Sequence, residues 1–310
     1  MLHQIKGLHH VTSMASDANE NNRFFTETLG LRRVKTTVNF DAPDVYHLYY
    51  GDAAGSPGSV MTYFPFPHMS RGQAGHGEVG VTEFAVPMGA LDYWKARLAA
   101  AKVEGLVEEP AFGAARIVFN GPDGERFALV EEEPGGRTPW TGADVSEDVG
   151  IFGFKSVRLR LQDGAATEEL LQFMGYERSE KNGALTRYAI DGGNGADVIE
   201  IEEIPDARSA GQGTGSVHHI AFAVLDRSAQ LEVRNALLDT GYQVTPVIDR
   251  NYFWAIYFRT PGGVLFEVAT DDPGFAHDEP LEHLGQSLKL PPQYEARRDE
   301  IERALPELIV

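Results

Sequence analysis

Four segments of the chain repeat one pattern, in which an alternating apolar strand leads into an amphipathic helix. The opening strands read LHHVTSMASD at residues 8–17, VGVTEFAVP at 79–87, FKSVRLRLQD at 154–163 and VHHIAFAVLD at 217–226. Further short strands follow each helix, and the last ones read GSVMTYF (58–64), ERFALVE (125–131), ADVIEIE (196–202) and GGVLFEVA (262–269). This switch from helical to strand period, within units of roughly 55 residues, predicts four β-α-β-β-β modules.

The modules divide the chain into two halves. Residues 1–133 hold modules one and two, residues 151–271 hold modules three and four, and the Gly- and Pro-rich stretch 134–150 is expected to link them. Residues 272–310 form a C-terminal tail with a short charged helix around residues 295–305. Modules one and four are the most alike, because both open with a His-His pair and close after a Pro-Gly turn.

The composition limits the classes of partner and of metal site. The 310 residues are 42% hydrophobic and carry a net charge of −19, which argues against a nucleic-acid or anionic-membrane surface. The chain has no apolar run of about 18 residues and no signal-peptide pattern at its start, so we expect a cytoplasmic globular protein. Because there is no cysteine, any metal must be held by His, Asp and Glu.

Aligning the modules places candidate ligands at equivalent positions in modules one and four only. One position of the opening strand holds, in module order, His10, Val81, Ser156 and His219. One position of the last strand holds Tyr63, Ala128, Glu200 and Glu267. Modules one and four thus offer two imidazoles and one carboxylate, with Tyr63 in the fourth place. Modules two and three offer the isolated Glu200, which alone binds no transition metal well.

Two imidazoles and one carboxylate are the ligand set typical of non-haem Fe(II) oxygenases, because three protein ligands leave coordination positions open. A fourth carboxylate would instead suit a Lewis-acid metal that holds water, and neutral Tyr63 is a poor ligand for Fe(II). Glu267 lies in an otherwise apolar strand, where a carboxylate is costly to bury unless it is paired or metal-bound. We therefore predict one metal site, formed by His10, His219 and Glu267.

The same stretches resemble the vicinal-oxygen-chelate (glyoxalase-fold) superfamily and, within it, the ring-cleaving dioxygenases that act on hydroquinones. The resemblance covers nearly the whole chain and is carried by GLHHVTSMASD (7–17), GSVHHIAFAV (215–224), YFRTPGGVLFEVATDDPGF (257–275) and HDEP (277–280). It implies an α+β fold in which the βαβββ modules form two half-barrel lobes. We expect modules one and four to pair, as do modules two and three.

The resemblance also implies the metal and the residues around it. Fe(II) would be held by the two histidines and the glutamate already singled out, and Mn(II) or another divalent metal could replace it in the isolated protein. The residues that match the family's catalytic positions are His9, Thr12, His218, Arg250 and Tyr257.

Strand geometry supports only part of this assignment. Thr12 should share a face with His10, whereas His9 and His218 should point away unless the strands are irregular there. A three-residue Pro-Gly-Gly loop would place Tyr257 directly opposite Glu267, whereas a four-residue loop would turn it to the other face. Arg250 fits a surface arginine as well as a functional one.

The function that agrees best with these observations is Fe(II)-dependent ring cleavage of a small aromatic diol by O₂, with a substituted hydroquinone as the substrate. An extradiol catechol dioxygenase remains an alternative, as does a glyoxalase-type isomerase or lyase. A metal-binding resistance protein of the same fold is a non-enzymatic alternative. A homo-oligomer is compatible with the sequence, and no feature of it suggests a nucleic-acid or membrane partner.

Overall fold

The computed structural model describes residues 1–309 and contains sixteen strands and five α-helices. The strands are β1 (Leu8–Ala15), β2 (Arg32–Asn39), β3 (Ala42–Gly51), β4 (Val60–Pro65), β5 (Glu78–Val86), β6 (Val107–Glu108), β7 (Arg116–Asn120), β8 (Arg126–Glu131), β9 (Gly153–Leu161), β10 (Glu177–Asn182), β11 (Leu185–Ala189), β12 (Val198–Glu203), β13 (Val217–Val224), β14 (Ile248–Asp249), β15 (Phe253–Arg259) and β16 (Leu265–Pro273). The α-helices are α1 (Ala18–Arg23), α2 (Leu91–Ala100), α3 (Ala165–Phe173), α4 (Arg227–Asp239) and α5 (Arg298–Ala304).

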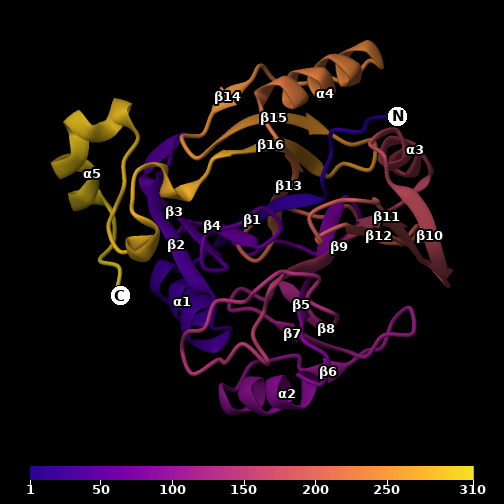
Figure 1. Ribbon diagram of the computed structural model, residues 1–310, viewed down its shortest axis with the longest axis horizontal. Coiled ribbons are helices and arrows are strands. Elements are labelled where there is room, and N and C mark those ends of the chain that lie inside the picture. The colour runs from indigo at the N-terminus through magenta and orange to yellow at the C-terminus, as the bar shows by residue number, and fades with distance from the viewer. Residues whose placement is uncertain (310) are drawn as a thin grey trace.

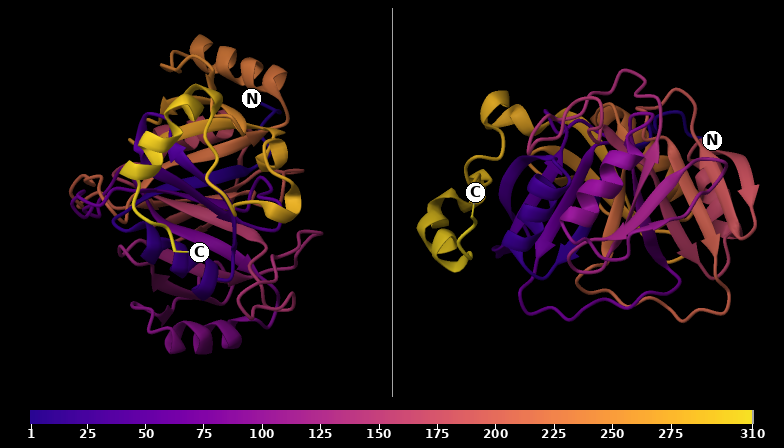
Figure 2. Two further views of the ribbon diagram at one scale, coloured as in Figure 1. Left: turned by 90° about the vertical axis from the view of Figure 1, so that its left-hand side faces the viewer. Right: turned by 90° about the horizontal axis from the view of Figure 1, so that it is seen from below.

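The strands form two eight-stranded sheets, with the helices on the outside of the molecule (Figures 1 and 2). The first sheet has the order β14-β15-β16-β13-β1-β4-β3-β2, and the second has the order β10-β11-β12-β9-β5-β8-β7-β6. Antiparallel pairing of β1 with β13 joins module one to module four, and pairing of β5 with β9 joins module two to module three. The predicted two-lobed fold is confirmed, and the two halves of the sequence are not the two lobes.

Helix starts follow the local sequence signals. Asp17 caps α1 and accepts a hydrogen bond from the backbone N–H of Glu20 at 2.7 Å. Asp226 caps α4 in the same way through Ala229, at 2.9 Å. A π-helical turn extends α1, and α5 lies within the charged stretch expected to be helical. None of the described helices combines the length and the hydropathy needed to cross a membrane.

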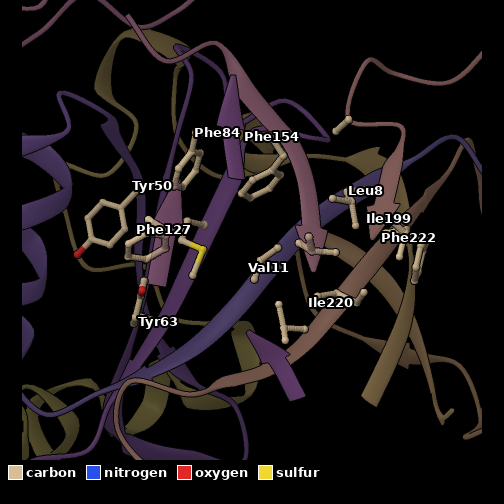
Figure 3. Packing of buried hydrophobic residues seen from close by; sticks show 14 of the residues in the cluster. Leu8, Val11, Tyr50, Tyr63, Phe84, Phe127, Phe154, Ile199, Ile220 and Phe222 are labelled. Atoms are coloured by element: carbon tan, nitrogen blue, oxygen red, sulfur yellow. The ribbon is translucent and has the colours of Figure 1, made fainter. Parts of the chain in front are cut away.

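Because side chains alternate along each strand, the first sheet has one face that carries His10 and one face that packs in the core. On β1, Val11 points away from the side of the sheet that carries His10, and it belongs to a buried cluster with Ile220 of β13 (Figure 3). The same cluster contains Phe84 and Phe154 of the second sheet, whose rings stack 5.3 Å apart. The two sheets therefore share one core on the faces turned away from the metal site.

The tail is fastened to the edge of the first sheet by a buried lysine. Lys35 of β2 is fully buried, and its ammonium lies 2.6 Å from a carboxylate oxygen of Asp278 and 2.6 Å from one of Glu279. Two carboxylates at this distance offset the cost of removing the ammonium from water. A β-bridge between Thr36 and Leu288 also covers the exposed edge of β2.

Tyr63 lies on the face that packs in the core, so the expectation that it is the fourth group of the metal site is wrong. The neighbouring residue, Thr62, takes that place. The register of β4 pairs Tyr63 with Ser13 and its neighbour Thr62 with Thr12, which faces the site. The Tyr63 hydroxyl donates a 2.9 Å hydrogen bond to the carboxylate of Glu125, in the turn before β8. This bond joins the two lobes.

Replacing Tyr63 with Phe should destabilise the protein by about 1–3 kcal/mol at pH 8, because Glu125 loses a donor while it stays buried. Burial raises the pKa of Glu125 to about 7, and the bond from Tyr63 opposes that rise. The cost should therefore be smaller at pH 6, where the carboxyl is mostly protonated. Urea unfolding at the two pH values measures both effects.

Tyr50→Phe is the matched control for this substitution. Tyr50 is equally buried, and its hydroxyl has no hydrogen-bond partner among the described residues. Its replacement should change the free energy of unfolding by less than about 0.5 kcal/mol. Equal costs for the two variants would mean that the bond between Tyr63 and Glu125 contributes nothing.

Candidate metal centre

Three adjacent strands of the first sheet bring His10, His219 and Glu267 together. His10 lies on β1, His219 on β13 and Glu267 on β16, and all three side chains are buried. One potential ligand atom of each lies within 4.8 Å of those of the other two. Nε2 of His219 is 2.9 Å from Glu267 Oε2, and Nε2 of His10 is 3.4 Å from the same oxygen.

The strand register explains this convergence. Ala221 of β13 lies between two neighbours in one row across the sheet, paired with Glu267 on one side and with His10 on the other. His219 lies two residues before Ala221 and therefore on the same face. The small side chain of Ala221 leaves the space between the three ligands free.

The donor set fits a divalent cation. Neither carboxylate oxygen of Glu267 accepts a hydrogen bond of good geometry from the described residues, although both are buried. Burial alone would raise the pKa of Glu267, but the imidazoles of His10 and His219 hold it well below its usual range. An ionised, buried carboxylate that faces two imidazole nitrogens is the environment that a bound metal ion would complete.

Each ligand histidine is supported by the histidine before it in the sequence. Nδ1 of His9 lies 2.9 Å from Nδ1 of His10, and Nδ1 of His218 lies 2.7 Å from Nδ1 of His219. Burial, with the neighbouring imidazole, lowers the pKa of His9 to about 3 and that of His218 to about 4, so both are neutral acceptors near pH 7. The ligand histidines can then keep their proton on Nδ1 and turn Nε2 to the metal.

Thr62 takes the place in module one that Glu267 takes in module four. Its hydroxyl is 2.9 Å from that of Thr12 and 2.8 Å from Nε2 of His47 on β3, and Tyr49 bonds the other ring nitrogen of His47 at 2.7 Å. All four residues face the site. A neutral hydroxyl engaged in this chain of hydrogen bonds is a poor metal ligand, so the candidate centre offers three protein ligands and leaves the side next to Thr62 without one.

A cavity of about 400 Å³ opens onto this centre. Its lining comprises His10, Met14, Asn39, Phe40, Asp41, His47, Tyr49, Phe64, Phe66, Met69, Gln212, His218, His219, Arg250, Phe253, Tyr257 and Glu267. Sequence reasoning singled out six of these residues, namely His10, His218, His219, Arg250, Tyr257 and Glu267. It missed the others, because they come from strands and turns far apart in the chain. A space of this size, with apolar and aromatic walls, suits a single substituted ring.

Tyr257 and Arg250 lie together on one wall of the cavity. Tyr257 is paired with Glu267 in the register of β15 and β16, as the three-residue loop predicts. Nε of Arg250 donates a 3.2 Å hydrogen bond to the Tyr257 hydroxyl, and the Arg250 side chain is mostly buried. Burial, followed by the nearby Glu267, raises the pKa of Tyr257, so its hydroxyl keeps its proton.

The equivalent place in the second lobe is filled by ion pairs. Arg158 replaces Ala221 there and lies 3.0 Å from Glu200, the counterpart of Glu267. Arg187 contacts the same carboxylate at 2.7 Å, and the hydroxyl of Ser156 donates to Glu83 at 2.9 Å. The arginines occupy the volume in which a metal would bind, which agrees with a single metal site per chain.

Comparison with known proteins relates the whole chain to one family. Residues 7–129 and 151–268 match the model of the Glyoxalase/Bleomycin resistance protein/Dioxygenase superfamily. The chain is 44% identical to a Bacillus subtilis protein provisionally named the ring-cleaving dioxygenase MhqO, with 98% of this chain and 97% of the relative covered. It is 35% identical to the chlorohydroquinone/hydroquinone 1,2-dioxygenase of Sphingobium indicum, with 99% and 98% covered.

A solved structure agrees with the fold over the full length. The crystal structure of a provisionally named dioxygenase from Bacillus subtilis superimposes with a TM-score of 0.96 at 43% sequence identity. The match covers 99% of this chain and 98% of the other. From its repeated modules, its paired lobes and these matches, the chain belongs to the glyoxalase, bleomycin resistance protein and dioxygenase superfamily.

Proposed function

We propose that this protein is an Fe(II)-dependent dioxygenase that cleaves the ring of a substituted hydroquinone with O₂. The proposal rests above all on the three candidate ligands His10, His219 and Glu267. On the side of Thr62 the described residues offer no fourth ligand, so a metal there could bind substrate and O₂. Relatives named as ring-cleaving dioxygenases, including one that acts on hydroquinone, support the reaction class. The same ligand count disfavours a glyoxalase-type isomerase or lyase, because that chemistry usually employs four protein ligands.

Fe(II) in this site would supply adjacent positions for the diol oxygen and O₂ and a route for electrons between them. The protein's own side chains would bind the ring and transfer protons to and from its hydroxyl groups. The aromatic side chains of the cavity exclude water and hold the ring by its faces. Neutral His218 at the cavity wall would accept the bond from His219 at Nδ1, keep its own proton on Nε2 and donate it in a hydrogen bond to an oxygen of the diol.

Tyr257 and Arg250, which line the same cavity, would also act on the substrate. The Tyr257 hydroxyl keeps its proton and can donate it or hold a free hydroxyl of the diol in place. Arg250 would fix the position of that hydroxyl by donating a hydrogen bond to its oxygen through Nε. Thr12 and His9 contribute indirectly, through Thr62 and through His10.

Oxygen uptake tests the proposed reaction. Protein loaded anaerobically with Fe(II) should consume O₂ with methylhydroquinone or chlorohydroquinone and release a ring-opened product. A parallel series of catechols decides between the two classes of diol. Uptake with catechols alone would make the protein an extradiol enzyme, and no uptake with any diol would refute dioxygenase activity.

Removing the carboxylate ligand should remove the metal. Glu267→Gln keeps the volume of the side chain but replaces an anionic ligand, so we expect metal content to fall at least tenfold from one ion per chain. Glu200→Gln is the control, because that carboxylate belongs to the second lobe and contacts arginines. It should lower stability and leave metal content unchanged. Elemental analysis of dialysed protein checks both, and two tightly bound metals per chain would contradict the single site.

Replacing Tyr257 with Phe should lower the turnover rate by about 10- to 10⁴-fold, because the cavity loses its proton donor while the volume stays almost the same. Metal content should not change, since Tyr257 is not a ligand. Oxygen uptake and iron content, measured on the same samples, separate the two effects. If Tyr257→Phe keeps full turnover on every diol, the Tyr257 hydroxyl has no part in catalysis and the side chain serves only in packing.

A further inference from the structure

The cavity has one permanent cation, Arg250. No other lysine or arginine of the described residues lines it. The remaining basic groups are histidines, and two of them belong to the metal site. Apart from a metal ion held by His10, His219 and Glu267, a carboxylate on a bound ring would therefore find a permanent counter-charge only at Arg250.

Arg250 is already paired with a carboxylate, that of Asp41. Oδ2 of Asp41 lies 3.2 Å from Nη1 of Arg250, and both residues line the cavity. Asp41 lies in the turn between β2 and β3, whereas Arg250 follows β14. Strands β2 and β14 are the two opposite edges of the first sheet. The pair therefore bridges the two ends of the curved sheet across the cavity.

The turn that carries Asp41 is held in place from outside the sheet. The hydroxyl of Tyr294, in the C-terminal tail, donates a 2.6 Å hydrogen bond to the backbone carbonyl of Phe40. The backbone N–H of Asp41 also donates to the side chain of Asn39 at 2.9 Å. The side chain of Asp41 is 77% exposed. The two hydrogen bonds nevertheless fix the backbone of the turn, and this places the Asp41 carboxylate next to Arg250.

We propose that Asp41 is a specificity-determining residue that neutralises Arg250 and restricts the cavity to uncharged diols. This inference rests on the proposed function and narrows its substrate class. A diol that carries a carboxylate would have to displace Asp41 from Arg250 or lie next to a like charge, and both are unfavourable. A diol with an alkyl or halogen substituent meets only the apolar and aromatic side chains around the ring. Arg250 stays free to hold the Tyr257 hydroxyl through Nε.

A matched pair of ligands tests the proposal. The probes are 2,5-dihydroxyphenylacetate and its neutral primary amide, which have the same ring and nearly the same size. Dissociation constants are measured by anaerobic calorimetry with the Fe(II)-loaded protein, so that no turnover is needed. The wild type should bind the amide more tightly than the acid. In Asp41→Asn, the ratio of the two constants should shift in favour of the acid by about 10-fold, because Arg250 gains a free charge.

Asp44→Asn is the control, since it makes the same charge change in the adjoining strand β3. Asp44 is exposed and does not line the cavity, so its replacement should leave the acid-to-amide ratio as in the wild type. A ratio in Asp41→Asn within twofold of that in Asp44→Asn would overturn the proposal, even with normal binding of the amide. Failure of the wild type to bind or cleave any uncharged diol would overturn the proposed function, and this inference with it.

Discussion

The antiparallel pairing of β1 with β13 is the contact on which the site depends. It joins strands whose ligand histidines are 209 positions apart in the sequence, and it sets them on one face of one sheet. Strand β16 then adds Glu267 through its parallel pairing with β13. Side chains alternate along these strands except at bulges beside His9 and His218. A slip of one residue in either pairing would therefore point a ligand side chain into the hydrophobic core instead of the site. The hydrophobic face that carries Val11 and Ile220 opposes such a slip, since it would have to be exposed at the same time.

The two lobes show how one framework can hold either a metal or a set of ion pairs. In the first lobe, Ala221 leaves an open space between two imidazoles and a carboxylate, and that buried carboxylate has no hydrogen-bond donor among the described residues. In the second lobe, Arg158 fills the same space and satisfies Glu200 directly. Both are solutions to the cost of burying a carboxylate in a sheet. Only the first leaves room for a cation and for ligands from solution.

Much of this architecture could be predicted from the sequence, because it depends on local periodicity and on repetition. The modules follow from alternation and repetition, and their pairing follows from the need to bring His10 and His219 to one ion. Tyr257 lies opposite Glu267 because the loop between the strands has three residues. The alignment of the four modules nevertheless places Tyr63 at the fourth position, whereas the strand register places Thr62 there. A turn motif marks where a hairpin reverses, but the number of residues in the loop sets the register. The contact between Asp41 and Arg250 has no local signal at all, since it depends on how far the sheet curves.

The C-terminal tail extends this dependence beyond the repeated modules. Lys35 is paired in register with Tyr49, which lines the cavity, and the tail's carboxylates hold the Lys35 ammonium. Asp278 also accepts a 2.9 Å hydrogen bond from the hydroxyl of Tyr252, whose ring lies under that ammonium. A lysine in this place would be unfavourable in an isolated module, because nothing inside the repeat neutralises it. The repeat supplies the candidate metal ligands. The tail neutralises the buried Lys35 ammonium behind the cavity wall, which stabilises the wall beside the candidate metal centre.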